Sequence, residues 1–291
     1  MEKSIIYAVT GLLCLFLAND AIAQKEGEFH LDKNYEISAI GTFHLNSEDA
    51  EVRITGSSRS DVHVKIDRIQ TIKGFTSARS EFDVRVESRG GDLYITERER
   101  SGVRVQVGTI RTDYTIDIEL PASVSIRIVG EDDDYVVRNV NGRISMEVED
   151  GDIEIIDCKG DYFQFELEDG DLKLDAGSGK LMANIEDGDI EVRRGTFENV
   201  DIEVEDGDVI LETSLSDGGT YDLRGEDATI EFIVTNGGGE FLIMKVDASV
   251  RSSSEYETIQ ETDHRAKLKL NGGSANVEIR TDDRRVRLSK N

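Results

Sequence analysis

The chain has 291 residues, of which 61 are Asp or Glu and 34 are Lys or Arg, so its formal net charge is −27 at pH 7. An acid excess on this scale repels a phosphate backbone, which excludes nucleic-acid binding through phosphates. It keeps a protein soluble and attracts cations or basic partners.

Residues 1–23 are predicted to be a secretory signal peptide. Lys3 supplies the positive charge of the N-terminal region, an apolar run extends from Ile5 to Leu17, and Ala21-Ile22-Ala23 form a small-residue cleavage site. The run of about 13 residues is shorter than the roughly 20 that a spanning helix needs. We therefore expect an exported protein, in the periplasm, on the cell surface or secreted, with no transmembrane segment after cleavage.

The two cysteines do not form a disulfide framework. Cys14 lies within the predicted signal peptide, and Leu12-Leu13 before it lack the small residues of a lipoprotein signal. Cys158 alone remains after cleavage, so no intramolecular disulfide can form. It falls in a predicted turn, where we expect an exposed thiol without a catalytic role.

Residues 24–120 are predicted to form an N-terminal β cap or irregular first coils. Short alternating segments such as "AEVRI" and "DVHVKI" are separated by Gly, Ser and Asp turns, which is typical of strands. Residues 69–80 are the longest interruption and are predicted to be a loop. His30, His44 and His63 fall on the outward phase of the strands, which favours surface imidazoles over zinc ligands.

The phrase Glu-Asp-Gly-Asp occurs four times between residues 148 and 211. Its glycines lie at 151, 170, 188 and 207, so the steps are 19, 18 and 19 residues. Apolar residues alternate with mostly polar ones on both sides of the phrase, and this two-residue period predicts half-buried strands. A recurring step indicates stacked repeats. The apolar columns are Ile144/Phe163/Leu181/Val200, Met146/Phe165/Ala183/Ile202, Val148/Leu167/Ile185/Val204, Ile153/Leu172/Ile190/Val209 and Ile155/Leu174/Val192/Leu211.

These patterns predict an all-β fold in which residues 121–280 form a β-solenoid with about 18–19 residues and two main strands per coil. Two short strands cannot bury an apolar face alone, whereas stacked coils bury a continuous core. Apolar residues do not recur every six positions, which argues against a left-handed hexapeptide solenoid. Residues 130–133 are interpreted as a degenerate acidic turn, and Ala228 takes the glycine position of a further coil.

The C-terminal end of the sequence departs from the repeat. Residues 268–279 are predicted to form a last turn, with Asn271 and Gly272 in place of the acids. Residues 281–291 form a basic tail that we expect to close or fray the far end of the stack, because an open sheet edge is prone to aggregation.

The segment "IELPASVSIRIVGEDDDYVVRNVNGRISMEVEDGDIEI", residues 118–155, resembles a bacterial β-strand-repeat family of unknown function whose members are named as candidate adhesins. Leu120-Pro121 followed by Val124 and Ile126 match the entry strand of that family, and the Gly-Asp-Ile, Gly-Asp-Leu and Gly-Asp-Val triplets match its repeat. The likeness covers roughly residues 110–280, although Asp replaces the usual Ser before each glycine. The resemblance implies an extracytoplasmic β-solenoid.

The acidic turns are the main candidate for function. Asp and Gly suit tight turns, and Asp side chains can cap backbone N–H groups, which is our first interpretation. The alternative is a carboxylate ladder that binds Ca²⁺, since hard cations favour oxygen ligands. The candidate ligands form two rails, Asp150/Asp169/Asp187/Asp206 and Asp152/Asp171/Asp189/Asp208.

Paired carboxylates also serve glycoside cleavage, but a catalytic pair is expected once, whereas these acids recur in every coil. We therefore expect a non-enzymatic protein that presents an acidic face for adhesion or envelope interaction, with a basic protein or a glycan as partner. The alternatives are a polysaccharide-acting enzyme on a β-helix scaffold and a purely structural envelope spacer.

Overall fold

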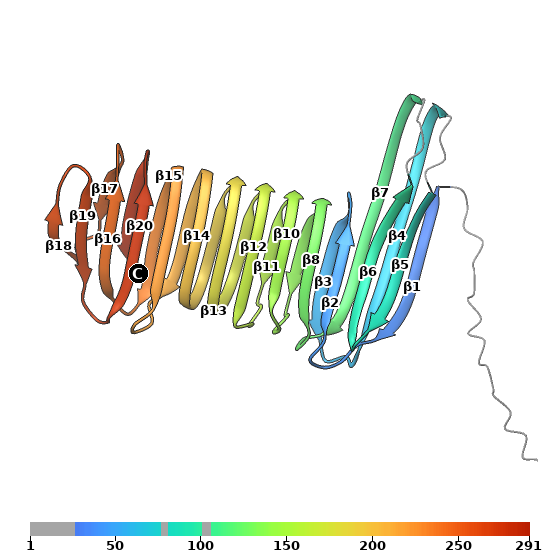
Figure 1. Ribbon diagram of the computed structural model, residues 1–291, viewed down its shortest axis with the longest axis horizontal. Coiled ribbons are helices and arrows are strands. Elements are labelled where there is room, and N and C mark those ends of the chain that lie inside the picture. Colours follow the sequence, from blue (N-terminus) through green and yellow to red (C-terminus); the bar gives the residue numbers. More distant parts are fainter. Residues whose placement is uncertain (1–26, 77–80, 101–105) are drawn as a thin grey trace, which may run out of the picture.

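A computed structural model of the chain describes residues 27–76, 81–100 and 106–291. The predicted signal peptide lies outside these ranges. In the described residues all regular structure is β, arranged as 21 hydrogen-bonded strands without a helix, which confirms the all-β prediction. Accordingly, no helix in this part of the chain has the length and apolar character needed to cross a bilayer. Figure 1 shows the strands side by side along one elongated body.

The strands are β1 (Glu28–Glu36), β2 (Thr42–Ser47), β3 (Glu51–Ser57), β4 (Asp61–Thr76), β5 (Glu81–Arg89), β6 (Asp92–Arg100), β7 (Gln106–Pro121), β8 (Ser125–Asp132), β9 (Asp134–Arg138), β10 (Ile144–Asp150), β11 (Ile153–Ile156), β12 (Tyr162–Asp169), β13 (Leu172–Asp187), β14 (Ile190–Ser214), β15 (Thr220–Asn236), β16 (Gly239–Lys245), β17 (Ser249–Ser252), β18 (Tyr256–Glu261), β19 (Arg265–Leu270), β20 (Ala275–Thr281) and β21 (Arg285–Lys290).

Alternating burial explains why these segments are strands. In β10, Ile144, Met146 and Val148 are buried while Ser145 and Glu147 point outward. A strand places successive side chains on opposite sides, so one side of each strand joins the core and the other faces solvent.

Parallel pairing between repeats follows the predicted columns. Ile144 of β10 pairs with Ile126 of β8 on one side and with Phe163 of β12 on the other. Leu181 of β13 continues the same column to Val200 of β14. The columns are therefore real stacks of side chains, and together they form one continuous apolar core.

The strands form two faces, which we name by their relation to the acidic turns. The entry face, whose strands lead into the turns, has the order β5, β6, β2, β8, β10, β12, parts of β13 to β15, β20, β16, β19 and β18. The exit face, whose strands leave the turns, has the order β1, β4, β7, β3, β9, β11, parts of β13 to β15, β21 and β17.

The N-terminal region combines parallel and antiparallel strands. The β2–β3 pair stacks in parallel on β8 and β9, whereas β1, β4 and β5 pair antiparallel at the end of the body. The loop predicted over 69–80 is wrong for residues 69–76, and residues 77–80 lie outside the described ranges. Ile69 to Thr76 continue β4, because β7 offers them an antiparallel partner from Asp113 to Gln106.

The C-terminal end does not follow chain order. Strands β20 and β21 lie between β15 on one side and β16 with β17 on the other (Figure 1). The last acidic turn of the stack is therefore formed by residues 281–284. Asn271 and Gly272 do lie in a turn, but it joins β19 to β20 and does not take the place of an acidic turn. Residues 285–290, expected in the basic tail, form β21 inside the exit face.

Candidate functional site

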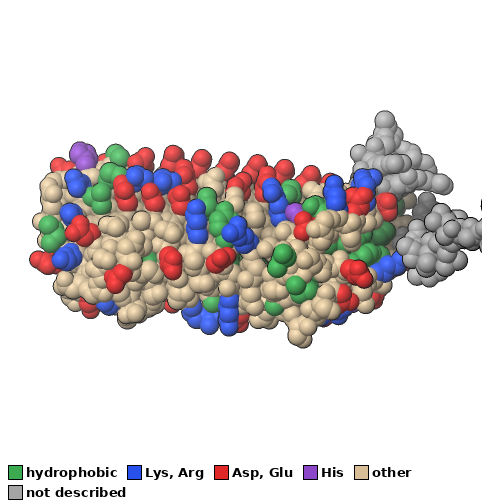
Figure 2. Space-filling view, turned by 60° about the horizontal axis from the view of Figure 1, so that its bottom comes forward, with side chains coloured by type: hydrophobic (Ala, Val, Ile, Leu, Met, Phe, Trp, Pro, Cys, Tyr) green, Lys and Arg blue, Asp and Glu red, His purple; other side chains and the backbone are tan. Residues whose placement is uncertain are grey.

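The acidic turns form a continuous ridge along one long edge of the body, which Figure 2 shows as a row of Asp and Glu side chains. In-register pairing places Asp150 beside Asp169, Asp169 beside Asp187 and Asp187 beside Asp206. We define the acidic ridge as Glu149, Asp150, Glu168, Asp169, Glu186, Asp187, Glu205 and Asp206. All eight of these side chains are exposed, and none of them makes an ion pair or hydrogen bond with another described residue.

The second predicted rail has a structural role in the turns. The backbone N–H of Asp171 donates to Oδ1 of Asp152 at 3.0 Å, that of Asp189 donates to Oδ1 of Asp171 at 3.0 Å, and that of Asp208 donates to Oδ1 of Asp189 at 2.7 Å. The carboxylate of Asp208 accepts from the N–H of Thr229 in the same way. Each carboxylate therefore ties its turn to the next one, since hydrogen bonds to charged groups are among the stronger ones.

The structure supports capping as a role of the second rail. Within the described ranges, no group of three or more His, Cys, Asp or Glu side chains is arranged to hold a metal ion. Calcium binding by either rail stays a prediction.

The glycine of each phrase is required by close stacking of the turns. Gly188 has a φ of +148°, and a Cβ atom built on it lies 2.1 Å from the carbonyl oxygen of Gly170. L-residues with a side chain rarely adopt this conformation, and the neighbouring backbone cannot move away. A Cβ atom at the glycine of a phrase would therefore collide with the preceding turn, whereas the carboxylate ladder itself continues to Thr229, next to Ala228.

Stacking brings like charges together along the ridge. Two unit charges about 5 Å apart repel by about 0.8 kcal/mol in water. Among the residues that the structure describes, cations approach the neighbouring ladder and not the ridge: Lys173 Nζ lies 3.8 Å from Asp171, and Arg284 Nη1 lies 3.7 Å from Asp208. The ridge is thus a concentrated negative surface with charge available to a partner.

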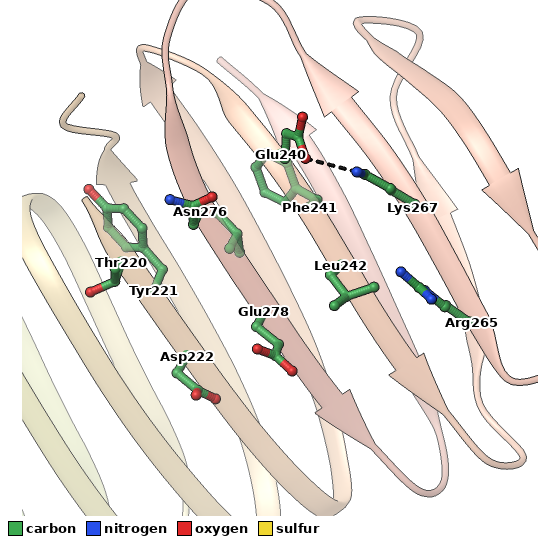
Figure 3. Close-up of a pocket in the computed structure, with 11 residues that line it drawn as sticks. Thr220, Tyr221, Asp222, Glu240, Phe241, Leu242, Arg265, Lys267, Asn276 and Glu278 are labelled. Carbon is green, nitrogen blue, oxygen red and sulfur yellow. Dashed lines mark ion pairs between the residues drawn. The ribbon is translucent and has the colours of Figure 1, made fainter. Parts of the chain in front are cut away.

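A groove of about 380 Å³ lies on the entry face near the C-terminal end (Figure 3). Strands β15 and β20 contribute Asp222 and Glu278 to one wall, and β19 contributes Arg265 and Lys267 to the other. Leu242 of β16 lies between Glu278 and Arg265 (Figure 3). This groove is not predictable from the sequence because it depends on the inserted position of β20, although the basic segment "RAKLKL" is a visible signal.

Several charges of this groove are already paired. Lys267 Nζ lies 2.9 Å from Glu240, and Arg280, which lies outside the lining, contacts Asp222 at 3.3 Å and Glu278 at 2.7 Å. A charged ligand has to displace these pairs, which lowers the net gain from binding.

The histidines lie on the outward side of their strands. His30 Nδ1 is 2.7 Å from Asp67 Oδ1, and His63 Nε2 is 2.8 Å from Asp32 Oδ1. His44 stacks on the ring of Tyr94 with 4.2 Å between ring centroids, and partial burial lowers its pKa.

The expectation of an exposed Cys158 thiol is wrong. Cys158 does lie in a turn, but its side chain is fully buried, and Sγ donates to the carbonyl oxygen of Ile156 at 3.5 Å. Burial raises the pKa of the thiol to about 11, so it is unreactive at neutral pH. The alternation of buried and outward residues does not extend into this irregular turn, so the sequence does not predict that the Cys158 side chain points inward.

A buried polar cluster lies at the N-terminal end of the ridge. Asp133, in the glycine position of the degenerate turn, is fully buried and accepts hydrogen bonds from the N–H of Ala50 at 2.6 Å and the hydroxyl of Tyr135 at 2.9 Å. Glu97 is 7% exposed and accepts from the hydroxyl of Tyr114 at 3.0 Å. The sequence signal for this cluster was the replacement of glycine by Asp133.

Burial raises the pKa of Glu97 to about 7, despite hydrogen bonds from the N–H of Glu48 and the hydroxyl of Tyr114 that favour its charged form. The negative charge of the nearby Asp133 also raises the pKa of Glu97. The buried Arg68 packs on the ring of Phe82. Glu97 therefore titrates close to neutral pH inside the fold.

We expect Glu97→Gln to stabilise the protein at alkaline pH. The folded chain binds the Glu97 proton more tightly than the unfolded chain, whose pKa is 4.5, so stability falls as pH rises from about 4.5 to about 7. The full difference corresponds to about 3 kcal/mol. Urea unfolding from pH 4 to pH 9 measures it, and parallel pH profiles for the variant and the native chain would contradict the assignment.

Comparisons with known proteins identify one family model and several solved structures that are similar to this chain. A family model described as Toastrack DUF4097 matches residues 40–288. A candidate adhesin from Bacteroides fragilis is similar in structure, with 12% identity, a TM-score of 0.50 and coverage of 89% of this chain and 97% of that one. A candidate cell-adhesion protein from Clostridium sporogenes has 11% identity, a TM-score of 0.29 and coverage of 90% and 100%.

A candidate lipid-binding protein from Parabacteroides distasonis has 13% identity, a TM-score of 0.36 and coverage of 90% of this chain and 96% of that one. A search of curated proteins finds no match. The structural likeness at these identities concerns the fold alone, whereas the family model spans most of the sequence and confirms the family resemblance. The chain therefore belongs to the Toastrack DUF4097 family.

Proposed function

We propose that this chain is an exported, non-enzymatic protein of the cell envelope that acts in adhesion through its acidic ridge. The ridge carries the proposal, because eight exposed carboxylates lie in register along one edge without a cationic partner among the described residues. The adhesin names of structurally similar proteins are in keeping with such a role.

We also propose that the architecture is a flattened β-solenoid with two strands per coil. Parallel registers of 18 and 19 residues between β10, β12, β13 and β14 support this description. A solenoid repeats one surface feature at a constant spacing, so a partner with regularly spaced cations can bind several turns at once.

The partner best suited to the ridge is a basic protein surface. Residues 131–231 contain 32 Asp or Glu and 8 Lys or Arg, a net charge of −24. A field of one sign speeds the encounter with an oppositely charged partner and weakens as salt concentration rises. Binding through the ridge is therefore expected to depend strongly on salt.

The test replaces Asp150, Asp169, Asp187 and Asp206 together by Asn. We expect the variant to lose at least about tenfold in affinity for a polylysine-coated surface at low salt, because four charges leave the ridge while the turns keep their shape. Surface plasmon resonance measures this loss. The matched control neutralises four exposed carboxylates at the C-terminal end, Asp247, Glu255, Glu257 and Asp263, and should bind nearly as the native chain does.

Equal losses in both variants would show that total charge, and not the ridge, sets the affinity. The same pair of proteins tests the calcium hypothesis through thermal unfolding. A saturable Ca²⁺-dependent rise in Tm at constant ionic strength, lost only in the ridge variant, would establish cation binding by the first rail. An equal response in both proteins would argue against it.

A further inference from the structure

A second hollow, of about 320 Å³, lies on the entry face over β8, β10 and β12. It exists because Ser145 is short while its partners in register, Arg127 and Gln164, are long. Glu147 and Glu166 pair at the next outward level and complete the lining. The hollow is therefore a polar depression in an otherwise regular strand surface.

The polar groups on β12 are held in position by one another. The hydroxyl of Tyr162 donates to Oε1 of Gln164 at 3.0 Å, and Nε2 of Gln164 donates to Oε1 of Glu166 at 3.0 Å. The guanidinium of Arg143 lies 5.4 Å from the centre of the Tyr162 ring. These two hydrogen bonds hold the amide of Gln164 in place, so less conformational entropy is lost when a ligand binds.

Other polar groups of the hollow have unused hydrogen-bonding capacity. Neither the guanidinium of Arg127 nor the carboxylate of Glu147 makes a hydrogen bond or ion pair with another described residue. This distinguishes the hollow from the larger groove, where Lys267 is paired with Glu240, and Asp222 and Glu278 are paired with Arg280. A ligand gains new hydrogen bonds here without breaking existing ion pairs.

The arrangement of charge limits the kind of ligand. Glu147 lies directly opposite Glu166, a like-charge cross-strand pair that is unfavourable by itself. Arg127 is the one cation of the lining, and Arg143 lies just outside it beside Tyr162, so the four charged groups in and beside the hollow sum to zero. An overall neutral ligand that offers both donors and acceptors fits this set best.

We propose that this hollow binds a neutral saccharide with adjacent hydroxyl groups. A sugar hydroxyl donates to the carboxylate of Glu147 or Glu166 and accepts from the guanidinium of Arg127 or the amide of Gln164. Small-molecule sites commonly place a few polar groups of this kind around a concave surface. The site lies on the entry face next to the acidic ridge, because Glu147 and Glu166 come two positions before Glu149 and Glu168 in β10 and β12. It uses different side chains from the ridge and so goes beyond the ridge-mediated function.

The test is an array of neutral oligosaccharides (glucans, mannans, galactans and xylans), with uronic-acid and amino-sugar oligosaccharides as charged comparisons. We expect the native chain to bind at least one neutral member. Arg127→Ala and Gln164→Ala should each weaken that binding by at least about tenfold, because each removes a direct hydrogen bond. Thermal unfolding confirms that both variants remain folded.

Two matched controls change the same residue types elsewhere. Arg287→Ala on the exit face and Gln260→Ala on the edge strand β18 should bind as the native chain does. The fourfold Asn variant of the ridge should also retain saccharide binding, so the two proposals can fail separately. Binding of no neutral oligosaccharide, binding of charged ones only, or undiminished binding by Gln164→Ala would each overturn the saccharide site.

Discussion

Replacing Ile185 by Asp is expected to lower the unfolding temperature sharply. Ile185 is fully buried between Leu167 and Val204 in one apolar column. A carboxylate there has neither water nor a cation within the core, and burying it costs several kcal/mol. Differential scanning calorimetry measures the shift in Tm.

The neighbouring residue provides the control. Asn184 precedes Ile185 in β13 and is exposed, so Asn184→Asp adds the same carboxylate on the solvent side of the same strand. We expect a change of Tm that is small beside that of Ile185→Asp. Similar unfolding temperatures for the two variants would refute the assignment of the core column.

Gly188→Ala is expected to destabilise the chain by roughly 3 kcal/mol, since it combines a strained φ with a close backbone contact. The added Cβ atom lies 2.1 Å from the carbonyl oxygen of Gly170, and the carboxylate ladder beside it holds the two turns together. Urea unfolding measures the loss of stability.

Gly218 separates the two contributions. It has a φ of +72°, but a Cβ atom built on it has no neighbour within 4 Å. Gly218→Ala therefore reports conformational strain alone, at about 1 kcal/mol. Equal destabilisation by the two substitutions would show that close stacking of the turns contributes nothing.

The repeat could be predicted because its signal is local and recurrent. Alternation placed Ile144, Phe163 and Leu181 in one column, and the pairing registers confirm that placement. The same reasoning found Ala228 in the glycine position beside Gly207. A constant step between like residues reports directly on which strands lie together.

Features that depend on distant partners could not be predicted. Residues 69–76 look like a loop until β7 supplies their antiparallel partner. Cys158 lies outside the clear alternation, and its burial depends on packing against other strands. Glu97 continues the buried phase of Leu93 and Ile95, but a glutamate gives no apolar signal in the sequence. The register of β8, β10 and β12 brings Arg127, Ser145 and Gln164 to one level, but the hollow itself depends on how these outward side chains are arranged, which the alternation does not report.

The inserted position of β20 and β21 affects the order in which this end of the chain can fold. A simple repeat array grows by adding each unit to the one before it, with short loops to close. Here β15 meets β16 first along the chain, yet its final neighbour is β20. Until β20 (residues 275–281) pairs with β15, the edge of β15 is open to pairing with β16. The C-terminal end therefore folds in competition with a nearer, incorrect pairing, a kinetic hazard that the regular repeats avoid.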